Sequence, residues 1–197
     1  MVSNYLVTSA MKPIRTHNSP IMFLAVLLVF PSALGFQTQG SRAAMSRPSA
    51  EEEIREVVFR KEMLDWIHSA DKAEAEAKTK SQKTAAPSLD FKVFLVSVDG
   101  KDPSDTLIKR LADIPRALKK TSSSSSSKEW PMAVLDKGTG QRAITFRVGK
   151  IHWLSETSAE VDGGYHCGAL CGIGITFTVN LLDGKWTLVK QQAKWIS

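Results

Sequence analysis

The apolar residues of this chain change their spacing once along the sequence, and that change restricts the fold to one class. Between residues 54 and 67 they recur every three or four positions, which is the spacing of an amphipathic helix. After Trp130 they alternate with polar residues and are interrupted by turn-forming pairs, which is typical of strands. A long N-terminal helix followed by a run of strands predicts an α+β fold in which the helix packs on a curved antiparallel sheet.

The first helix is expected to begin near Ser49. Glu52 follows three positions later, which is the pattern of a capping box, and the neighbouring acids favour the positive end of a helix dipole. The apolar face has six members with two aromatic residues at its edges: Ile54, Val57, Val58, Met63, Leu64 and Ile67, with Phe59 and Trp66. Residues 71–83 have no apolar face, so the helix either continues into solvent or frays before Pro87.

Three further segments precede the strand-rich half. Residues 91–98 are apolar and β-branched and end at an Asp-Gly pair, which predicts a strand entering a turn. Ser104 and the acidic residue after it open a short helix that ends before Pro115. A run of serines lies within residues 121–128, and because serines have little to bury, we expect a flexible surface loop there.

Glycines mark the bends in the strand-rich half. Gly149 shifts the alternation of the apolar residues, which predicts a β-bulge. Residues 171–181 alternate regularly and lead to Asp183-Gly184, a pair typical of a tight hairpin. A final strand is expected to run from there to Ile196.

The first 35 residues have the three-part order of a secretory signal peptide. Basic residues come first, an apolar stretch follows at 21–30, and small residues place a cut before Phe36. This stretch is too short to span a bilayer as a helix, which needs about 20 residues. We therefore expect a signal peptide at 1–35, a disordered tether at 36–49 and a single domain at 50–197. The protein would be secreted or periplasmic and would meet the membrane only through the transient signal peptide.

The charge pattern argues against nucleic acid as a partner. The formal net charge of +6 falls to +4 without Lys12 and Arg15 of the leader. Acidic residues are interspersed among the remaining lysines and arginines, so no unopposed basic face is expected. Such a pattern is typical of a solvated surface.

Both cysteines of the chain, Cys167 and Cys171, lie in one glycine-rich segment. In an extended strand, residues four apart are about 13 Å from each other, so a disulfide requires the residues between them to fold back. The neighbouring glycines permit that bend, and export to an oxidising compartment favours the bond. We expect a disulfide at a hairpin tip that fixes local shape more than it stabilises the fold.

Two other kinds of site are compatible with this segment. A metal could be held by His166, Cys167 and Cys171 with His152 as a fourth ligand, although zinc sites have two paired motifs and this segment has one. A redox-active thiol pair is the second kind, although such pairs have two residues between the cysteines and this pair has three. We expect no metal and no cofactor.

Several segments together resemble a known superfamily. Residues 52–60 (EEIREVVFR), followed by a strand, a short helix and a curved sheet, are similar to the nuclear transport factor 2-like (cystatin-like) superfamily. Residues 148–153 (VGKIHW), the Gly-Gly-Tyr-x-Cys segment at 163–167 and the closing residues 184–197 look like those of a group of uncharacterised exported bacterial proteins. The likeness covers residues 50–197. It implies a cone between helices and sheet, which hosts isomerases and dehydratases in some members and only binding or assembly in others.

Function is expected to be binding, because no complete catalytic motif is present and no Gly-x-Ser-x-Gly turn occurs. We expect an exported domain that binds a small ligand, a peptide or a protein partner without catalysis. The expected pocket walls are aromatic: Tyr165, Phe177, Trp153 and Trp186.

Two alternatives remain from the sequence. One is an enzyme of isomerase or hydrolase type, with His152, His166 or Asp99 as proton carrier in the cone. The other is a structural or envelope protein without a pocket. A buried acid–base pair would favour the enzyme, an apolar cone would favour the binder, and a filled cone would favour the structural protein.

Overall fold

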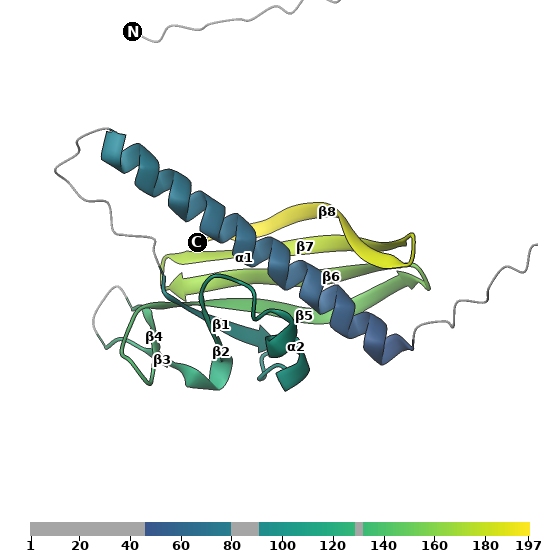
Figure 1. Cartoon of the computed structure of the whole chain (residues 1–197), viewed down its shortest axis with the longest axis horizontal. Helices are drawn as coiled ribbons and strands as arrows, with labels where there is room; N and C mark the ends of the chain where they lie inside the picture. The colour runs from purple at the N-terminus through teal and green to yellow at the C-terminus, as the bar shows by residue number, and fades with distance from the viewer. Residues whose placement is uncertain (1–45, 80–90, 129–131) are drawn as a thin grey trace, which may run out of the picture. The chain divides into compact units, whose positions relative to one another are not determined.

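A single long helix, α1 (Arg47–Thr79), lies obliquely across one face of a six-stranded sheet (Figure 1). The computed structural model describes residues 46–79, 91–128 and 132–197 of the chain. The predicted α+β class, with a long N-terminal helix packed on a sheet, is confirmed, and the sheet is mostly antiparallel. The predicted signal peptide and most of the predicted tether lie outside the described residues.

The described residues form these further elements in chain order: β1 (Val93–Val98), α2 (Asp105–Arg110), β2 (Ala117–Lys120), η1 (Thr121–Ser123), β3 (Ser124–Ser126), β4 (Val134–Asp136), β5 (Ala143–Ser155), β6 (Ser158–Gly168), β7 (Cys171–Leu182) and β8 (Lys185–Ile196). The main sheet has the order β2-β1-β5-β6-β7-β8, and β3 pairs with β4 separately. Strands β5 to β8 form an antiparallel meander in which each strand pairs with the next.

The part of the sheet formed by β1 and β2 departs from the predicted antiparallel arrangement. Strand β1 pairs in parallel with β2 on one side and with β5 on the other. The reason is the connection, because α2 and its loops carry the chain back to the starting end of β1 before β2 begins. The direction of a strand depends on such connections and not on its own apolar spacing.

The start and the buried face of α1 differ in detail from the prediction. The helix begins at Arg47, so Ser49 lies inside it and does not act as the expected cap. The helix continues through residues 71–79, as the first of the two alternatives for that region predicts. Phe59 is fully buried, whereas Leu64, expected on the apolar face, is 47% exposed.

The serine run is regular structure where a flexible loop is expected. Its first part is the 3₁₀ turn η1, and Ser124–Ser126 form β3, which pairs antiparallel with β4. Peptide groups of β4 need hydrogen-bond partners, and serine backbone supplies them without any apolar side chain. The expectation was wrong because strand pairing uses the backbone, whereas composition reports the side chains.

The predicted turns and bulge are confirmed. Asp183-Gly184 joins β7 to β8 with φ angles of 50° and 74°, the left-handed pair that a tight two-residue hairpin requires. Asp99 and Gly100 have the same φ angles at the end of β1. The register of β5 against β6 shifts around Gly149, as a bulge requires.

The hydrophobic core lies between α1 and the facing side of the sheet. Its largest members come from α1, β1, β5, β6 and β7: Ile54, Val58, Phe59, Met63, Phe94, Val96, Ile144, Phe146, Val161, Phe177 and Val179. Leu107 of α2 and Leu111 just after it close the core on the β1 side. The core thus holds α1 at a defined position against the sheet.

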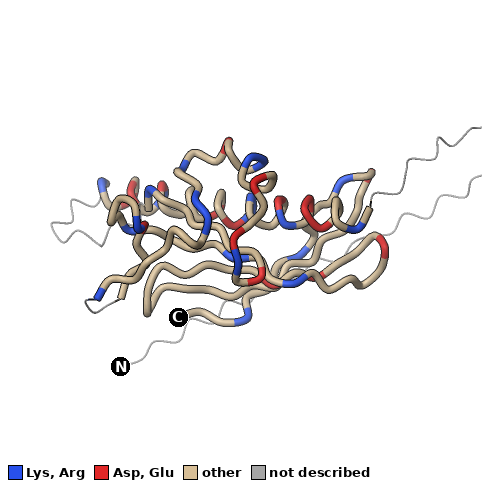
Figure 2. The backbone as a smooth tube through the Cα atoms, turned by 90° about the horizontal axis from the view of Figure 1, so that it is seen from below, with Lys and Arg blue, Asp and Glu red and all other residues tan. Residues whose placement is uncertain are grey.

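Charged residues of both signs are interspersed along α1 (Figure 2). Opposite charges four positions apart form ion pairs on the helix: Arg55–Glu51, Arg60–Glu56, Lys61–Asp65 and Lys78–Glu74. Exposed pairs of this kind add little, so packing on the sheet does more to stabilise the helix.

Candidate functional site

A cleft opens between α1 and the strands β6, β7 and β8. Its volume is about 330 Å³, near the lower end of the roughly 300–1,000 Å³ typical of small-molecule sites. The residues around it are Lys61, Glu62, Asp65, Trp66 and Ser69 of α1, Tyr165 of β6, Ile173, Ile175 and Phe177 of β7, and Gln191 of β8. We call it the Glu62 cleft.

Aromatic rings form one side of the Glu62 cleft. The ring of Trp66 lies edge-on to that of Tyr165, with centroids 4.7 Å apart and an interplanar angle of 73°. Trp66 also packs on Phe91 at 5.7 Å, and Tyr165 packs on Phe146 at 5.9 Å. Edge-to-face contacts of this kind are favourable, so these rings hold their positions before any ligand arrives.

Glu62 is an ionisable residue at a buried position. Only 5% of its surface is exposed. Both carboxyl oxygens are inaccessible, and neither makes a hydrogen bond of normal geometry within the described part of the chain. Leaving a buried polar group without a partner costs about 1–3 kcal/mol, so a carboxyl retained in such a place points to a role other than stability.

The surroundings of Glu62 favour its neutral form. Burial raises the pKa of its carboxyl well above the usual range. The nearby amide of Gly164 and the positive charge of Arg147 oppose that rise, while the negative charge of Asp65 adds to it. A neutral carboxyl carries one O–H group, which can donate a hydrogen bond, and one carbonyl oxygen, which can accept one.

Two consecutive glycines of β6 allow close packing here, and Gly163 is the one that makes room for this carboxyl. A Cβ atom at Gly163 would lie 2.9 Å from Glu62 Oε1 and 2.7 Å from the ring of Phe177. A Cβ atom at Gly164, whose φ is +138°, would overlap the carbonyl oxygen of Ile173. Glycine inside a strand weakens the strand, so its presence often marks a position where another group approaches the backbone closely. Strand β6 is therefore shaped to admit Glu62 and Phe177 side by side.

The rim of the Glu62 cleft is polar. Lys61 Nζ and Asp65 Oδ2 are 2.7 Å apart and form an ion pair along α1. Ser69 is exposed beside them, and Gln191 contributes an amide from β8. An apolar interior with a polar rim is the usual composition of a site for a small molecule.

The four aromatic residues expected to line one pocket are divided between two clefts. Tyr165 and Phe177 line the Glu62 cleft. Trp153 and Trp186 line a second cleft of about 290 Å³ with Arg47 at the start of α1. The two clefts lie at different points along α1, since the Glu62 cleft is lined by helix residues 61–69 and the second cleft by Arg47 and Ala50.

The second cleft is built around the two tryptophans. Their rings meet edge-on with centroids 5.6 Å apart, and the guanidinium of Arg47 lies 5.4 Å from the ring centre of Trp153. Trp186 Nε1 is buried and has no hydrogen-bond partner among the residues that the structure describes. These contacts account for both tryptophans as packing residues.

The three proton carriers of the enzyme alternative do not line the Glu62 cleft. His152 lines a groove with Glu160 and Asp162, which flank the inward-facing Val161 and therefore point to the opposite side of the sheet. The His166 side chain reaches the surface, but the neighbouring residues partly desolvate its ring, and this together with the charge of Arg147 lowers its pKa. Asp99 is exposed at the end of β1, 3.9 Å from Arg55.

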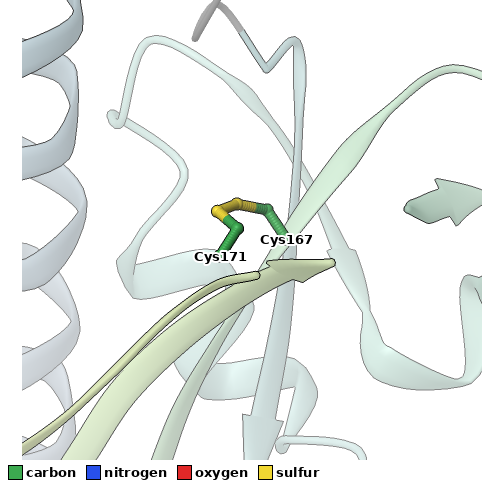
Figure 3. The surroundings of a disulfide bond; sticks show 2 residues. All are labelled: Cys167 and Cys171. Atoms are coloured by element: carbon green, nitrogen blue, oxygen red, sulfur yellow. A yellow bond between two sulfur atoms is a disulfide. The ribbon is translucent and has the colours of Figure 1, made fainter. Parts of the chain in front are cut away.

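Cys167 and Cys171 lie at disulfide distance at the tip of the β6–β7 hairpin, with Cα atoms 5.2 Å apart (Figure 3). The intervening residues fold back, and Gly168 pairs with Cys171 across the tip. Cys167 is buried in the core and Cys171 packs against it. No group of three or more His, Cys, Asp or Glu side chains in the described ranges is arranged to hold a metal ion.

Glu62 is the residue that sequence reasoning missed. The signal for it was present, since Val58, Glu62 and Trp66 are four positions apart and thus on one side of a helix. Ala50, Ile54 and Ala70 continue the same four-residue series, and most of the series is buried. A glutamate in the middle of an apolar stripe is an exception that marks a candidate functional residue.

These features define the chain as an α+β domain with a cleft of small-molecule size between its long helix and its sheet. Among the helices of the described residues, none is long and apolar enough to cross a membrane. Comparison with known protein families, curated proteins and solved structures finds no match to this chain. Its function is therefore inferred from the geometry of the cleft itself.

Proposed function

We propose that this protein binds a small, mainly apolar molecule in the Glu62 cleft and does so without catalysis. The observation that carries the proposal is the Glu62 carboxyl, which is buried beside an apolar cleft and makes no hydrogen bond of normal geometry to any residue that the structure describes. Strongly perturbed ionisable groups in clefts are concentrated at functional sites. The glycine at position 163, which makes room for the carboxyl, adds a second cost that a purely structural strand would avoid.

Binding is favoured over catalysis because the titratable groups described beside Glu62 are poorly suited as its acid–base partner: Lys61 and Asp65 pair with each other at the rim. Proton-transfer catalysis needs a donor and an acceptor whose pKa values lie near the working pH. Burial, together with the neighbouring Glu62, raises the pKa of Tyr165, which makes that phenol a weaker acid. The histidines lie elsewhere on the sheet, as described above.

Export of the protein, to the periplasm or the exterior, is part of the same proposal. Its support is the order of basic, apolar and small residues in positions 1–35, together with the paired cysteines. Membership of the nuclear transport factor 2-like superfamily is proposed on the helix, strand and sheet order and on the sequence segments given above. A cleft between a long helix and a sheet is where that resemblance leads us to expect a ligand.

The test is binding of a neutral fluorescent probe, 6-propionyl-2-(dimethylamino)naphthalene (prodan), to the full-length protein. Its emission shifts to shorter wavelength in apolar surroundings, so a saturable shift reports a site. Ser69→Trp places a large side chain on the exposed rim of the cleft. We expect this variant to weaken probe binding by about tenfold or more, which corresponds to about 1.4 kcal/mol.

The matched control is His68→Trp. His68 is the preceding exposed position on α1 and is not among the residues around the cleft. The His68→Trp variant should bind the probe as tightly as the wild type does, and circular dichroism should show that both variants fold. Equal binding by Ser69→Trp and His68→Trp would show that the probe binds elsewhere and would reject the proposed site.

A further inference from the structure

We propose that the ligand of the Glu62 cleft is a neutral molecule whose polar end is a hydrogen-bond acceptor, such as a ketone, ester or amide carbonyl, and that the Glu62 carboxyl donates to it. This inference rests on the proposed function, because it names the chemistry of the molecule bound at the same site. It concerns one polar contact inside an otherwise apolar cleft.

The position of Glu62 supports a donor role. Its carboxyl lies among the ring of Phe177, the backbone of Gly163 and Gly164, and the apolar stripe of α1. The nearby Gly164 amide is itself a donor and can only serve the carbonyl oxygen of the carboxyl. The O–H group of the neutral carboxyl has no acceptor within the described part of the chain. Both oxygens are inaccessible in the unliganded protein, so the Glu62 side chain turns toward the cleft when a ligand brings the acceptor.

Charges facing Glu62 come from each element packed against it. On α1, Asp65 pairs with Lys61 at the rim, and its negative charge favours the neutral form of Glu62. Arg147 of β5 favours an ionised Glu62, whereas Tyr165 of β6 carries no charge at neutral pH, and burial raises its pKa further from that range. The residues contributed to the cleft by β7 and β8 are uncharged. Burial outweighs these charges and favours the neutral carboxyl.

A cationic ligand fits this site less well than a neutral one. An ammonium group would have to lose its water and would also require Glu62 to ionise in a buried position. Desolvation of two opposite charges often exceeds their mutual attraction. A neutral carbonyl loses much less on burial and gains a hydrogen bond from the carboxyl.

The experiment compares three ligands that share a phenyl ring and a four-carbon chain: 4-phenyl-2-butanone, 4-phenylbutan-2-amine and butylbenzene. The first is a neutral acceptor, the second is a cation below pH 9, and the third has no polar group. Each is titrated against prodan bound to the full-length protein from pH 5 to pH 9. We expect the ketone to bind about tenfold more tightly than butylbenzene at the acid end and more tightly than the amine.

Two substitutions of Glu62 separate donation from packing. Glu62→Gln keeps a neutral donor at every pH, so the preference for the ketone should remain and should not depend on pH. Glu62→Leu removes the donor, so the ketone and butylbenzene should bind within about twofold of each other. In the wild type, ketone binding should weaken as pH rises and Glu62 loses its proton.

The outcomes separate this inference from the proposed function. Tighter binding of the amine than of the ketone would overturn the inference and assign Glu62 the role of an anion, while the cleft would stand as a binding site. Equal binding of the ketone and butylbenzene to the wild type would also overturn it. Failure of prodan and all three ligands to bind would instead reject the proposed function.

Discussion

Replacing Glu62 by glutamine should change how the stability of the fold depends on pH. In the folded protein the carboxyl is 5% exposed and burial raises its pKa well above its ordinary value of 4.5. In the unfolded chain the same carboxyl is hydrated and ionises near that ordinary value. The folded state therefore holds a proton that the unfolded state releases over the pH range between the two pKa values.

The sign and size of the effect follow from proton linkage. A group whose pKa is higher in the folded state contributes stability below its unfolded pKa and loses that contribution as pH rises toward its folded pKa. Within that window each pH unit changes the free energy of unfolding by up to about 1.4 kcal/mol. Glutamine does not titrate. Above pH 4.5, the free energy of unfolding of Glu62→Gln should therefore rise relative to that of the wild type by up to about 1.4 kcal/mol per pH unit.

The assay is urea unfolding of the full-length protein, followed by circular dichroism at half-unit steps from pH 4 to pH 8 with the cysteine pair intact. Glu76→Gln is the control, because it removes a carboxyl from an exposed position of the same helix. We expect the Glu76→Gln curve to run parallel to the wild type and the Glu62→Gln curve to diverge from it. Parallel curves for Glu62→Gln and wild type would refute the burial of this carboxyl and the reasoning built on it.

Three other predictions concern stability away from Glu62. Gly163→Ala should lower the free energy of unfolding by about 1–3 kcal/mol in urea, since its Cβ would lie 2.7 Å from a buried ring; Gly138→Ala, whose closest contact is 3.6 Å, is the control and should cost much less. Cys171→Ser should lower the free energy of unfolding by about 2 kcal/mol, the value expected for closing so short a loop. A variant as stable as the wild type would count against a disulfide. The Lys119 ammonium, 2.8 Å away, holds the pKa of buried Asp136 at about 2. Asp136→Asn should therefore be less stable than the wild type at pH 7. Between pH 3.8 and pH 2 it should lose less stability than the wild type does, which unfolding measured across that pH range would show.

Most of the secondary structure was accessible from local patterns. The Asp183-Gly184 hairpin and the bulge at Gly149 depend on residues that are neighbours in the chain, so the sequence alone predicts them. Parallel pairing of β1 was not accessible, because it depends on where α2 returns the chain. The pairing of β3 was missed for a similar reason, since its partner β4 satisfies the backbone of a serine run that has no apolar pattern.

The candidate site was predicted only in part. Alternation along β6 and β7 placed Tyr165 and Phe177 on the inner side of the sheet, and both line the Glu62 cleft. Trp153 and Trp186 were expected to line the same pocket, although these two line a separate cleft. Alternation tells which side of a sheet a residue faces, but it does not tell where a helix will cross that side.

The sequence by itself determined the α+β class, the long helix, the hairpins and the inward-facing residues, because all of these follow from spacings of a few residues. Only the tertiary structure decided that Glu62 is buried beside a cleft with no normal hydrogen bond from the described part of the chain. That outcome depends on Gly163, about a hundred positions further along the chain, whose missing side chain leaves space for the carboxyl and for Phe177. Burial is a property of what packs against a residue, so the chemistry of Glu62 arises only when α1 and β6 meet.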